Sequence, residues 1–220
     1  MEPISRKYLF FDLDGTLTDS MPGIARAVQY ALRRFGIDVQ DLAALKPFLG
    51  PPLRDSFMEF YGMSPEEADR AVAVSREYFV PRGMFENELY PGIPELLAAT
   101  AAAGRVNVIA TSKPQPFAER IVAHFGIDRH FRLISGSTFD GRRKTKADVI
   151  RHALSALGIA PGEAVMIGDR RHDVEGAAEE GLPAIAVEWG YAPPGELEAA
   201  RPLRIVPDVE TLRRLLLGNE

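Results

Sequence analysis

The chain has 220 residues, 46% of them hydrophobic and 26% charged, with a net charge of −5 and no cysteine. This length allows one large domain or one domain with a small insertion, and the acidic balance argues against nucleic acid and membranes as partners. The absence of cysteine excludes disulfides and thiolate metal sites, and because no apolar run is long enough for a signal peptide or a membrane span, we expect a cytoplasmic protein.

Residues 8–11 are predicted to form a buried strand, because the segment is short, rich in aromatic residues and without polar alternation. Asp12 and Asp14 follow at its carboxyl end, which is where open α/β sheets bind their ligands. Gly15 allows the chain to turn at that point, so both carboxylates can face one crevice.

The next stretch of the chain is predicted to be helical. Residues 23–35 carry one apolar stripe that ends before Gly36, and residues 53–61 form a second short helix. The sequence from Ser64 to Glu67 matches a capping box and opens a helix that continues to about residue 79. Residues 38–53, rich in proline and glycine, are expected to be irregular.

From residue 90 onward, strands and helices alternate. The expected strands are residues 106–111, 133–135, 165–168 and 184–187, and the expected helices are residues 93–103, 116–125, 145–157, 173–180 and 209–217. This alternation predicts an α/β fold with a Rossmann-like parallel sheet and helices on both faces. The core domain then comprises residues 1–19 and 86–220, and residues 20–85 form an inserted, all-helical cap domain.

Polar groups gather where the predicted parallel strands end. Asp12 and Asp14 follow the first strand, Thr111 and Ser112 end the second, a basic stretch at 142–146 follows the third, and Asp169 follows the fourth, with Asp173 close behind it. Like charges about 4 Å apart repel by about 4 kcal/mol at an effective dielectric near 20, so several carboxylates in one crevice call for protonation or a cation. Hard oxygen ligands without His or Cys suit Mg²⁺, and such a site favours phosphoryl transfer.

These stretches resemble a known family. Four stretches are similar to the motifs of the haloacid dehalogenase superfamily. They are FDLDGTLTDS at residues 11–20, IATSKP at 109–114, SGS at 135–137 with DGRRKTK at 140–146, and GD at 168–169 with DVEGA at 173–177. The similarity points to the phosphoglycolate-phosphatase-like branch, in which a helical cap follows the first strand.

The resemblance implies roles for individual residues. Asp12 is expected to be the nucleophile that forms an aspartyl-phosphate, and Asp14 the group that protonates the leaving oxygen and then activates water. Mg²⁺ would be held by Asp12, the backbone carbonyl of Asp14, and Asp169, with Asp173 behind them or bound through water. Thr111, with Ser112 beside it, would bind the phosphate, and Lys146 would neutralise phosphate and nucleophile together.

Several positions keep more than one interpretation. Lys144 and Lys146 are both candidates for the site lysine. Lys113 either reaches the site or is only a surface residue of its loop. Arg54, in a proline-stiffened loop of the predicted cap, either meets a carboxylate of the substrate or lies on the surface. His172, between two motif acids, is expected to be a loop-exposed or capping residue.

The functional prediction is a Mg²⁺-dependent phosphomonoester hydrolase acting on a small phosphorylated metabolite, with phosphoglycolate as the leading candidate. The alternatives are a sugar-phosphate or nucleoside-monophosphate phosphatase, a phosphomutase with the same apparatus, and a non-catalytic binding protein. The last is disfavoured because Asp12, Asp14, Thr111, Lys146 and Asp169 are all present. Nothing in the sequence distinguishes a monomer from a dimer.

Overall fold

The computed structural model describes residues 4–218 and divides into two compact units. The first, here called the core unit, contains the chain up to Thr18 and from Leu89 onward, and the second, the helical unit, spans Asp19–Glu88. Two short strands, β2 (Thr18–Asp19) and β3 (Glu88–Leu89), pair with each other where the chain passes from one unit to the other.

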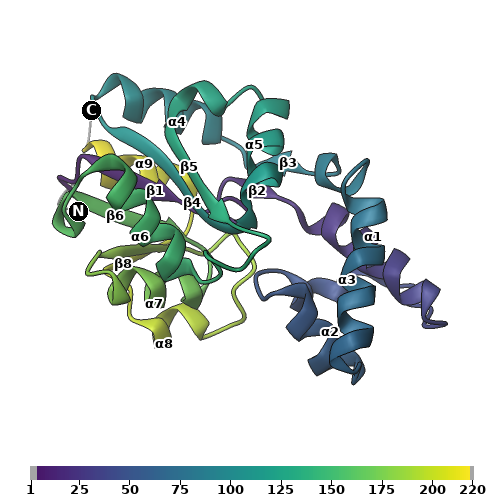
Figure 1. The fold of residues 1–220 in the computed structure, drawn as a ribbon. Helices are drawn as coiled ribbons and strands as arrows, with labels where there is room; N and C mark the ends of the chain where they lie inside the picture. Colours follow the sequence, from purple (N-terminus) through teal and green to yellow (C-terminus); the bar gives the residue numbers. More distant parts are fainter. Residues whose placement is uncertain (1–3, 219–220) are drawn as a thin grey trace. The chain divides into compact units, whose positions relative to one another are not determined.

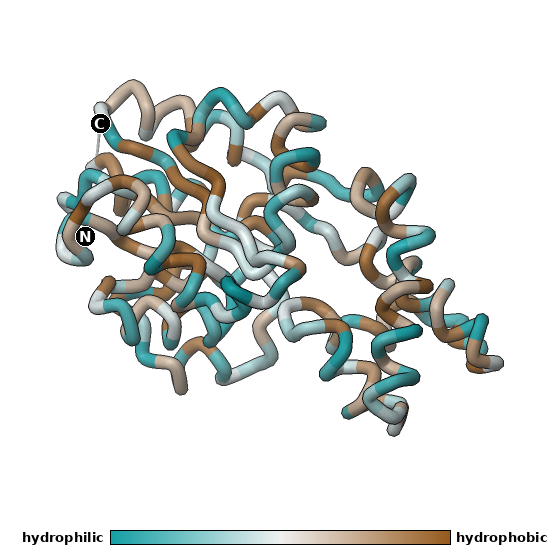
Figure 2. Tube along the Cα trace, viewed as in Figure 1, coloured by the Kyte–Doolittle hydropathy of each residue, from teal (hydrophilic) through white to brown (hydrophobic). Residues whose placement is uncertain are grey.

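The core unit is built on a six-stranded sheet in the order β5-β4-β1-β6-β7-β8, with every described neighbouring pair parallel. Its strands are β1 (Tyr8–Phe11), β4 (Val106–Pro114), β5 (Phe131–Ser137), β6 (Ala164–Gly168), β7 (Ala184–Val187) and β8 (Arg204–Val206). The central strands β1, β6 and β7 are apolar and almost fully buried, as expected for a sheet covered on both faces. Figure 2 shows hydrophobic residues following these strands through the interior of the unit.

Helices cover both faces of this sheet (Figure 1). One face carries α6 (Lys146–Leu157), α7 (Arg171–Glu179) and α8 (Glu196–Ala200), and the other carries α4 (Ile93–Ala102), α5 (Gln115–His124) and α9 (Val209–Leu217). Val149 and Val174, from α6 and α7, pack with Phe10 and Met166 of the sheet in one buried cluster. Short 3₁₀ turns join these elements at Asp128–His130 and Pro161–Glu163.

The predicted fold class is confirmed: the sheet is parallel, with helices on both of its faces. The structure adds β8 and α8, which the sequence pattern did not predict, because the strand has only three residues and the helix only five. It also extends β4 to Pro114, three residues beyond the predicted end at 111. The extra residues continue the strand through a register irregularity between Ala110 and Pro114.

The helical unit contains α1 (Met21–Arg34), α2 (Leu53–Tyr61) and α3 (Pro65–Phe79), with 3₁₀ segments at Leu42–Phe48 and Gly83–Phe85. The apolar faces of these helices share a core that includes Val28, Leu32 and Phe57. The capping box predicted at the start of α3 is present: Ser64 Oγ accepts from Glu67 N at 3.2 Å, and Glu67 accepts from Ser64 N at 2.9 Å. Of the stretch expected to be irregular, residues 42–48 form the first of the 3₁₀ segments.

Throughout residues 4–218, no helix combines the length and the apolar character needed to cross a membrane.

Candidate active site

The register of the sheet brings the first, second and fourth strand ends of the sequence prediction to one edge. Phe11 of β1 is paired with Ile109 of β4 on one side and with Ile167 of β6 on the other. All three strands run in the same direction, so the residues that follow these positions emerge together at the carboxyl edge. Asp12 and Asp169 are therefore neighbours although 157 positions separate them in the sequence.

Three carboxylates form a compact cluster at this edge. Asp12, Asp169 and Asp173 each offer an oxygen within 4.8 Å of the others. Asp169 is fully buried and accepts hydrogen bonds from the Thr16 hydroxyl at 3.3 Å and from the Tyr191 backbone N–H at 2.7 Å. Such contacts hold the carboxylate in one orientation before any ligand arrives.

Asp173 is held by the start of α7. It is 1% exposed, and its Oδ2 accepts from the backbone N–H of Arg170 at 3.0 Å. The Arg170 guanidinium is in turn fixed by Glu196, at 2.7 Å. This local arrangement turns Asp173 inward toward Asp12 and Asp169 rather than toward solvent.

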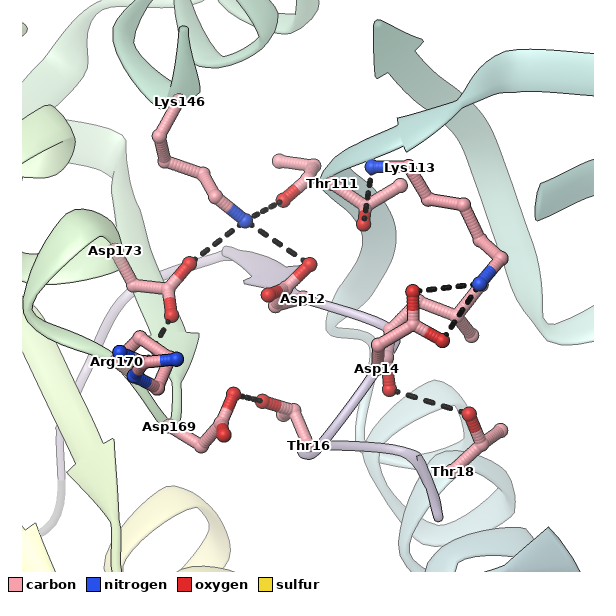
Figure 3. A network of polar contacts seen from close by, with 12 residues as sticks. Asp12, Asp14, Thr16, Thr18, Thr111, Lys113, Lys146, Asp169, Arg170 and Asp173 are labelled. Carbon is pink, nitrogen blue, oxygen red and sulfur yellow. Dashed lines mark hydrogen bonds and ion pairs between the residues drawn. The ribbon is translucent and has the colours of Figure 1, made fainter. Parts of the chain in front are cut away.

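Lys146 is the cation of the cluster (Figure 3). It is the first residue of α6, and its Nζ lies 2.9 Å from Asp12 Oδ1, 2.7 Å from Asp173 Oδ1 and 3.1 Å from the carbonyl oxygen of Ala110. Burial alone would lower the pKa of Lys146, but the Asp12 and Asp173 carboxylates together raise it above its ordinary value, so the lysine is charged.

The acidic groups carry more negative charge than the lysine offsets. Burial, followed by the charges of Asp173 and Asp12, raises the pKa of Asp169 well above its usual range. Burial also raises the pKa of Asp173 to about 6, although the Lys146 ammonium opposes this shift. If all three carboxylates are ionised, Lys146 compensates only one of them, and a divalent cation would offset the two remaining negative charges. The all-oxygen donor set fits Mg²⁺ or a similar hard ion.

The glycines around the cluster leave no space for side chains. A Cβ at Gly15 would lie 2.3 Å from Asp169 Oδ2, one at Gly190 would lie 2.3 Å from Asp169 Cβ, and one at Gly168 would lie 2.2 Å from Asp173 Cγ. Gly15 also adopts φ +82°, a conformation that L side chains rarely take. The backbone therefore approaches the carboxylates closely on several sides.

Asp14 occupies a separate position. Its carboxylate does not belong to the three-membered cluster and instead contacts Lys113, whose Nζ lies 2.8 and 2.7 Å from its two oxygens. The sequence left open whether Lys113 reaches the site, and the structure places it there, with its side chain 5% exposed. The predicted metal contact through the Asp14 carbonyl stays a prediction.

The other predicted residues divide between the site and the surface. Thr111 is 1% exposed and lies in β4 two residues before Lys113, while Ser112 is exposed. Lys146, rather than the exposed Lys144, contacts the acidic cluster. Arg54 belongs to the helical unit, where its Nε pairs with Asp69 at 2.7 Å.

His172 lies in the first turn of α7, where its Nδ1 is 3.8 Å from Glu175, so it is a helical residue rather than part of a loop.

Sequence reasoning missed three residues that support the site through a hydroxyl, a backbone N–H or an indole N–H. Thr16, Tyr191 and Trp189 were not assigned to it, yet Thr16 and Tyr191 bond Asp169, and Trp189 Nε1 donates to the Thr16 carbonyl at 3.1 Å. Backbone donors carry no residue-type signal in a sequence, so only the Thr in the DGT run could have pointed to such a contact.

Comparison with known proteins extends this description. Residues 9–187 match the family described as haloacid dehalogenase-like hydrolase. A 5'-nucleotidase of Pseudomonas aeruginosa is 47% identical over 94% of this chain and 94% of its own length. The tyrosine-protein kinase PtkA of Mycobacterium tuberculosis is 42% identical over 85% of this chain and 64% of its own length. A phosphoglycolate phosphatase of Yersinia pestis is 32% identical over 82% of this chain and 80% of its own length.

A solved structure also matches the fold of this chain closely. The crystal structure of a predicted phosphatase from Clostridium acetobutylicum superimposes with a TM-score of 0.92 at 45% identity, covering 96% of this chain and 98% of that one.

Proposed function

This chain belongs to the haloacid dehalogenase-like hydrolases and is a phosphatase, and from that premise we propose that it hydrolyses small phosphate monoesters with Mg²⁺ through an aspartyl-phosphate. The observation that carries the proposal is the separation of two carboxylates that are two positions apart in the sequence. Asp12 lies in the acidic cluster beside Lys146, whereas Asp14 lies outside it beside Lys113. This separation supports different roles for the two carboxylates, with Asp12 as the attacking group and Asp14 as the group that moves a proton.

Asp12, Asp169 and Asp173 would hold the metal ion. When bound, Mg²⁺ supplies positive charge that offsets the repulsion between a phosphate dianion and the attacking carboxylate. Lys146 supplies a second positive charge from the protein itself, at 2.9 Å from Asp12. Thr111 and the backbone around Ser112 would hydrogen-bond the phosphoryl oxygens at the end of β4.

In the first half of the reaction, an Asp12 carboxylate oxygen attacks phosphorus. The bond between phosphorus and the ester oxygen breaks, and that oxygen leaves with a proton from Asp14. In the second half, the Asp14 carboxylate takes a proton from water, the resulting hydroxide oxygen attacks phosphorus, and the Asp12–phosphorus bond breaks. The products are an alcohol and inorganic phosphate, and Asp14 regains the proton it gave.

For the substrate, we favour a nucleoside 5'-monophosphate over phosphoglycolate. The relative named 5'-nucleotidase is 47% identical to this chain over 94% of both proteins, whereas the Yersinia relative named phosphoglycolate phosphatase is 32% identical. A contact of Arg54 with a carboxylate of the substrate stays a prediction.

The test is a phosphate-release screen with Mg²⁺ over nucleoside 5'-monophosphates, sugar phosphates and phosphoglycolate. Asp12→Asn is the blank, because it keeps the size of the side chain and removes the nucleophile. We expect phosphate from at least one nucleoside monophosphate and none with the variant. No phosphate from any ester, or full activity of Asp12→Asn, would overturn the proposal. A phosphomutase would show exchange of phosphate between positions without net release.

A second candidate is transfer of a phosphoryl group from ATP to a protein tyrosine, which is favoured by the 42% identity to the kinase PtkA. This chain spans 64% of that protein's length. Incubation with γ-labelled ATP separates the two: a phosphatase releases label as phosphate, and a kinase retains it on tyrosine in a form stable to hydroxylamine, unlike an aspartyl-phosphate.

A further inference from the structure

Lys113 and Asp14 form a second, partly buried ion pair in the core unit, separate from the pair between Lys146 and Asp12 (Figure 3). The Lys113 ammonium contacts both oxygens of Asp14, at 2.8 and 2.7 Å, so it fixes the plane of the carboxylate as well as its position. The Lys113 side chain is 5% exposed and the Asp14 side chain 20% exposed. Asp14 therefore keeps one open side, while Lys113 is enclosed.

The backbone around Lys113 explains why its side chain points at Asp14. The pairing of β4 with β5 shifts register between Ala110 and Pro114, and such irregularities re-aim side chains. The N–H of Lys113 donates to Thr111 Oγ1 at 3.2 Å, which ties the lysine to the predicted phosphate-binding residue. On the other side, Gly136 of β5 lies so close that a Cβ there would be 2.8 Å from the Lys113 carbonyl oxygen.

We propose that Lys113 is a positioning residue that orients the Asp14 carboxylate to take a proton from water in the second half-reaction. This inference rests on the proposed function. That step needs Asp14 as an oriented carboxylate with an open side, and this is the arrangement that the structure shows. General bases held in place contribute about 10²–10⁴-fold to a rate. The Lys113 ammonium contacts both oxygens of Asp14, so its effect is expected through Asp14.

The substrate p-nitrophenyl phosphate isolates this step, because its leaving group departs without a proton and the first half-reaction then needs no acid. We expect Lys113→Met to release a rapid burst of about one nitrophenol per protein and then to turn over at least about tenfold more slowly than the wild type. Phosphorylated protein should accumulate and be visible as an acid-quenched mass increase. Lys144→Met, at an exposed lysine, is the matched control and should behave as the wild type.

A double-mutant comparison tests whether Lys113 acts through Asp14. Adding Lys113→Met to Asp14→Asn should leave the steady-state rate of Asp14→Asn unchanged. A further loss in the double variant, or a burst phase slowed as much as the steady state, would overturn the inference, because Lys113 would then act on phosphate binding or on the fold. If Lys113→Met does not fold, Lys113→Gln carries the same readouts with a shorter reach and no charge.

The outcomes also distinguish a failure of this inference from a failure of the proposed function. A wild-type protein that releases no nitrophenol, or in which no variant is ever phosphorylated, overturns the proposed function and this inference with it. A wild-type protein that turns over normally while Lys113→Met keeps its full steady-state rate overturns the inference alone.

Discussion

Nζ of Lys146 lies 2.9 Å from Oδ1 of Asp12, with the two side chains only 4% and 13% exposed. Because the same ammonium lies 2.7 Å from Asp173, it links the proposed nucleophile to the acidic residues that would hold a cation. Lysine placed in this way orients Asp12 in the resting protein and can neutralise a phosphate that arrives beside it. The contact depends on α6 beginning at residue 146, since the lysine is the first residue of that helix.

Replacing this lysine should affect both activity and stability. We expect Lys146→Met to lower kcat/KM by about 10²–10³-fold, the usual loss when one preorganised charge is removed from a reacting centre. In EDTA its free energy of unfolding should fall by about 3–5 kcal/mol, because Asp12 and Asp173 lose their buried partner. Denaturant unfolding and steady-state kinetics check the two effects. A variant as stable and as active as Lys144→Met would contradict the assignment.

The carboxylate cluster predicts a specific response to metal. Mg²⁺ at about 100 times its dissociation constant should stabilise the wild type by about 2.7 kcal/mol. Asp169→Asn should lose this stabilisation, yet melt at a higher temperature than the wild type in EDTA, because it removes a buried carboxylate whose pKa is raised by burial and by its neighbours. Thermal melts with EDTA and with Mg²⁺ give both values. Equal Mg²⁺ stabilisation in the two proteins would argue against the proposed metal site.

Most of the fold and much of the site followed from the sequence, because their signals are local. Hydrophobic pattern and residue type are enough to predict one buried strand that ends in Asp12 and Asp14 and another that ends in Asp169. The parallel order of the strands then predicts that these acids meet, as Asp12 and Asp169 do. The sequence could also nominate Lys146, although it could not exclude Lys144.

What the sequence could not supply are contacts that depend on backbone position or on the direction of one side chain. The bond from the Tyr191 backbone to Asp169 could be made by almost any residue type. The pairing of Lys113 with Asp14 depends on a register shift in β4, which has no signature in the residues themselves. These features arise from the packing of the sheet edge and become visible only in three dimensions.

Two capping boxes offer a matched test of how helix ends support the site. Thr145 Oγ1 accepts from Asp148 N at 3.1 Å at the start of α6, and Ser64 Oγ accepts from Glu67 N at 3.2 Å at the start of α3. Thr145→Ala and Ser64→Ala should each cost about 1 kcal/mol of stability. Only Thr145→Ala should also lower kcat, by about tenfold, because Lys146 follows it directly and small displacements in a reacting centre are costly. Equal kinetic effects would contradict the link between the cap and the site.

Stability should also depend on pH through His152, which lies outside the acidic cluster. Its Nδ1 is 2.9 Å from the hydroxyl of Ser135, and that hydroxyl donates to the Val149 carbonyl at 2.7 Å. Burial, with the charge of Arg143, lowers the pKa of His152 below the ordinary 6.5, so the unfolded chain takes up the proton first.

The contribution of His152 to the free energy of unfolding is thus fully present above pH 6.5. It is lost as the pH falls through the lower pKa of His152 in the folded state. Relative to His152→Gln, the wild type should lose free energy of unfolding as the pH is lowered from about 7.5 to about 5. Denaturant unfolding in the presence of Mg²⁺ checks this. A difference between the two proteins that is constant with pH would contradict it.

Gly190 provides the sharpest steric test of the metal site. A Cβ at this position would lie 2.3 Å from Asp169 Cβ and 2.4 Å from its Oδ2, so alanine must displace the carboxylate or its own loop. The displacement should also disturb the hydrogen bond from the next residue, Tyr191, whose N–H lies 2.7 Å from the same oxygen. Gly162→Ala is the matched control, because a Cβ there meets nothing within 4 Å.

We expect Gly190→Ala to raise the Mg²⁺ concentration needed for half-maximal activity by at least about tenfold, as changes to groups that orient metal ligands commonly do. Its stability in EDTA should fall by about 1–3 kcal/mol, the usual cost of overpacking. Gly162→Ala should change neither value. If Gly190→Ala loses stability while its Mg²⁺ requirement stays at the wild-type value, Asp169 does not bind the ion, because a ligand displaced by the new methyl group could not hold the metal as before.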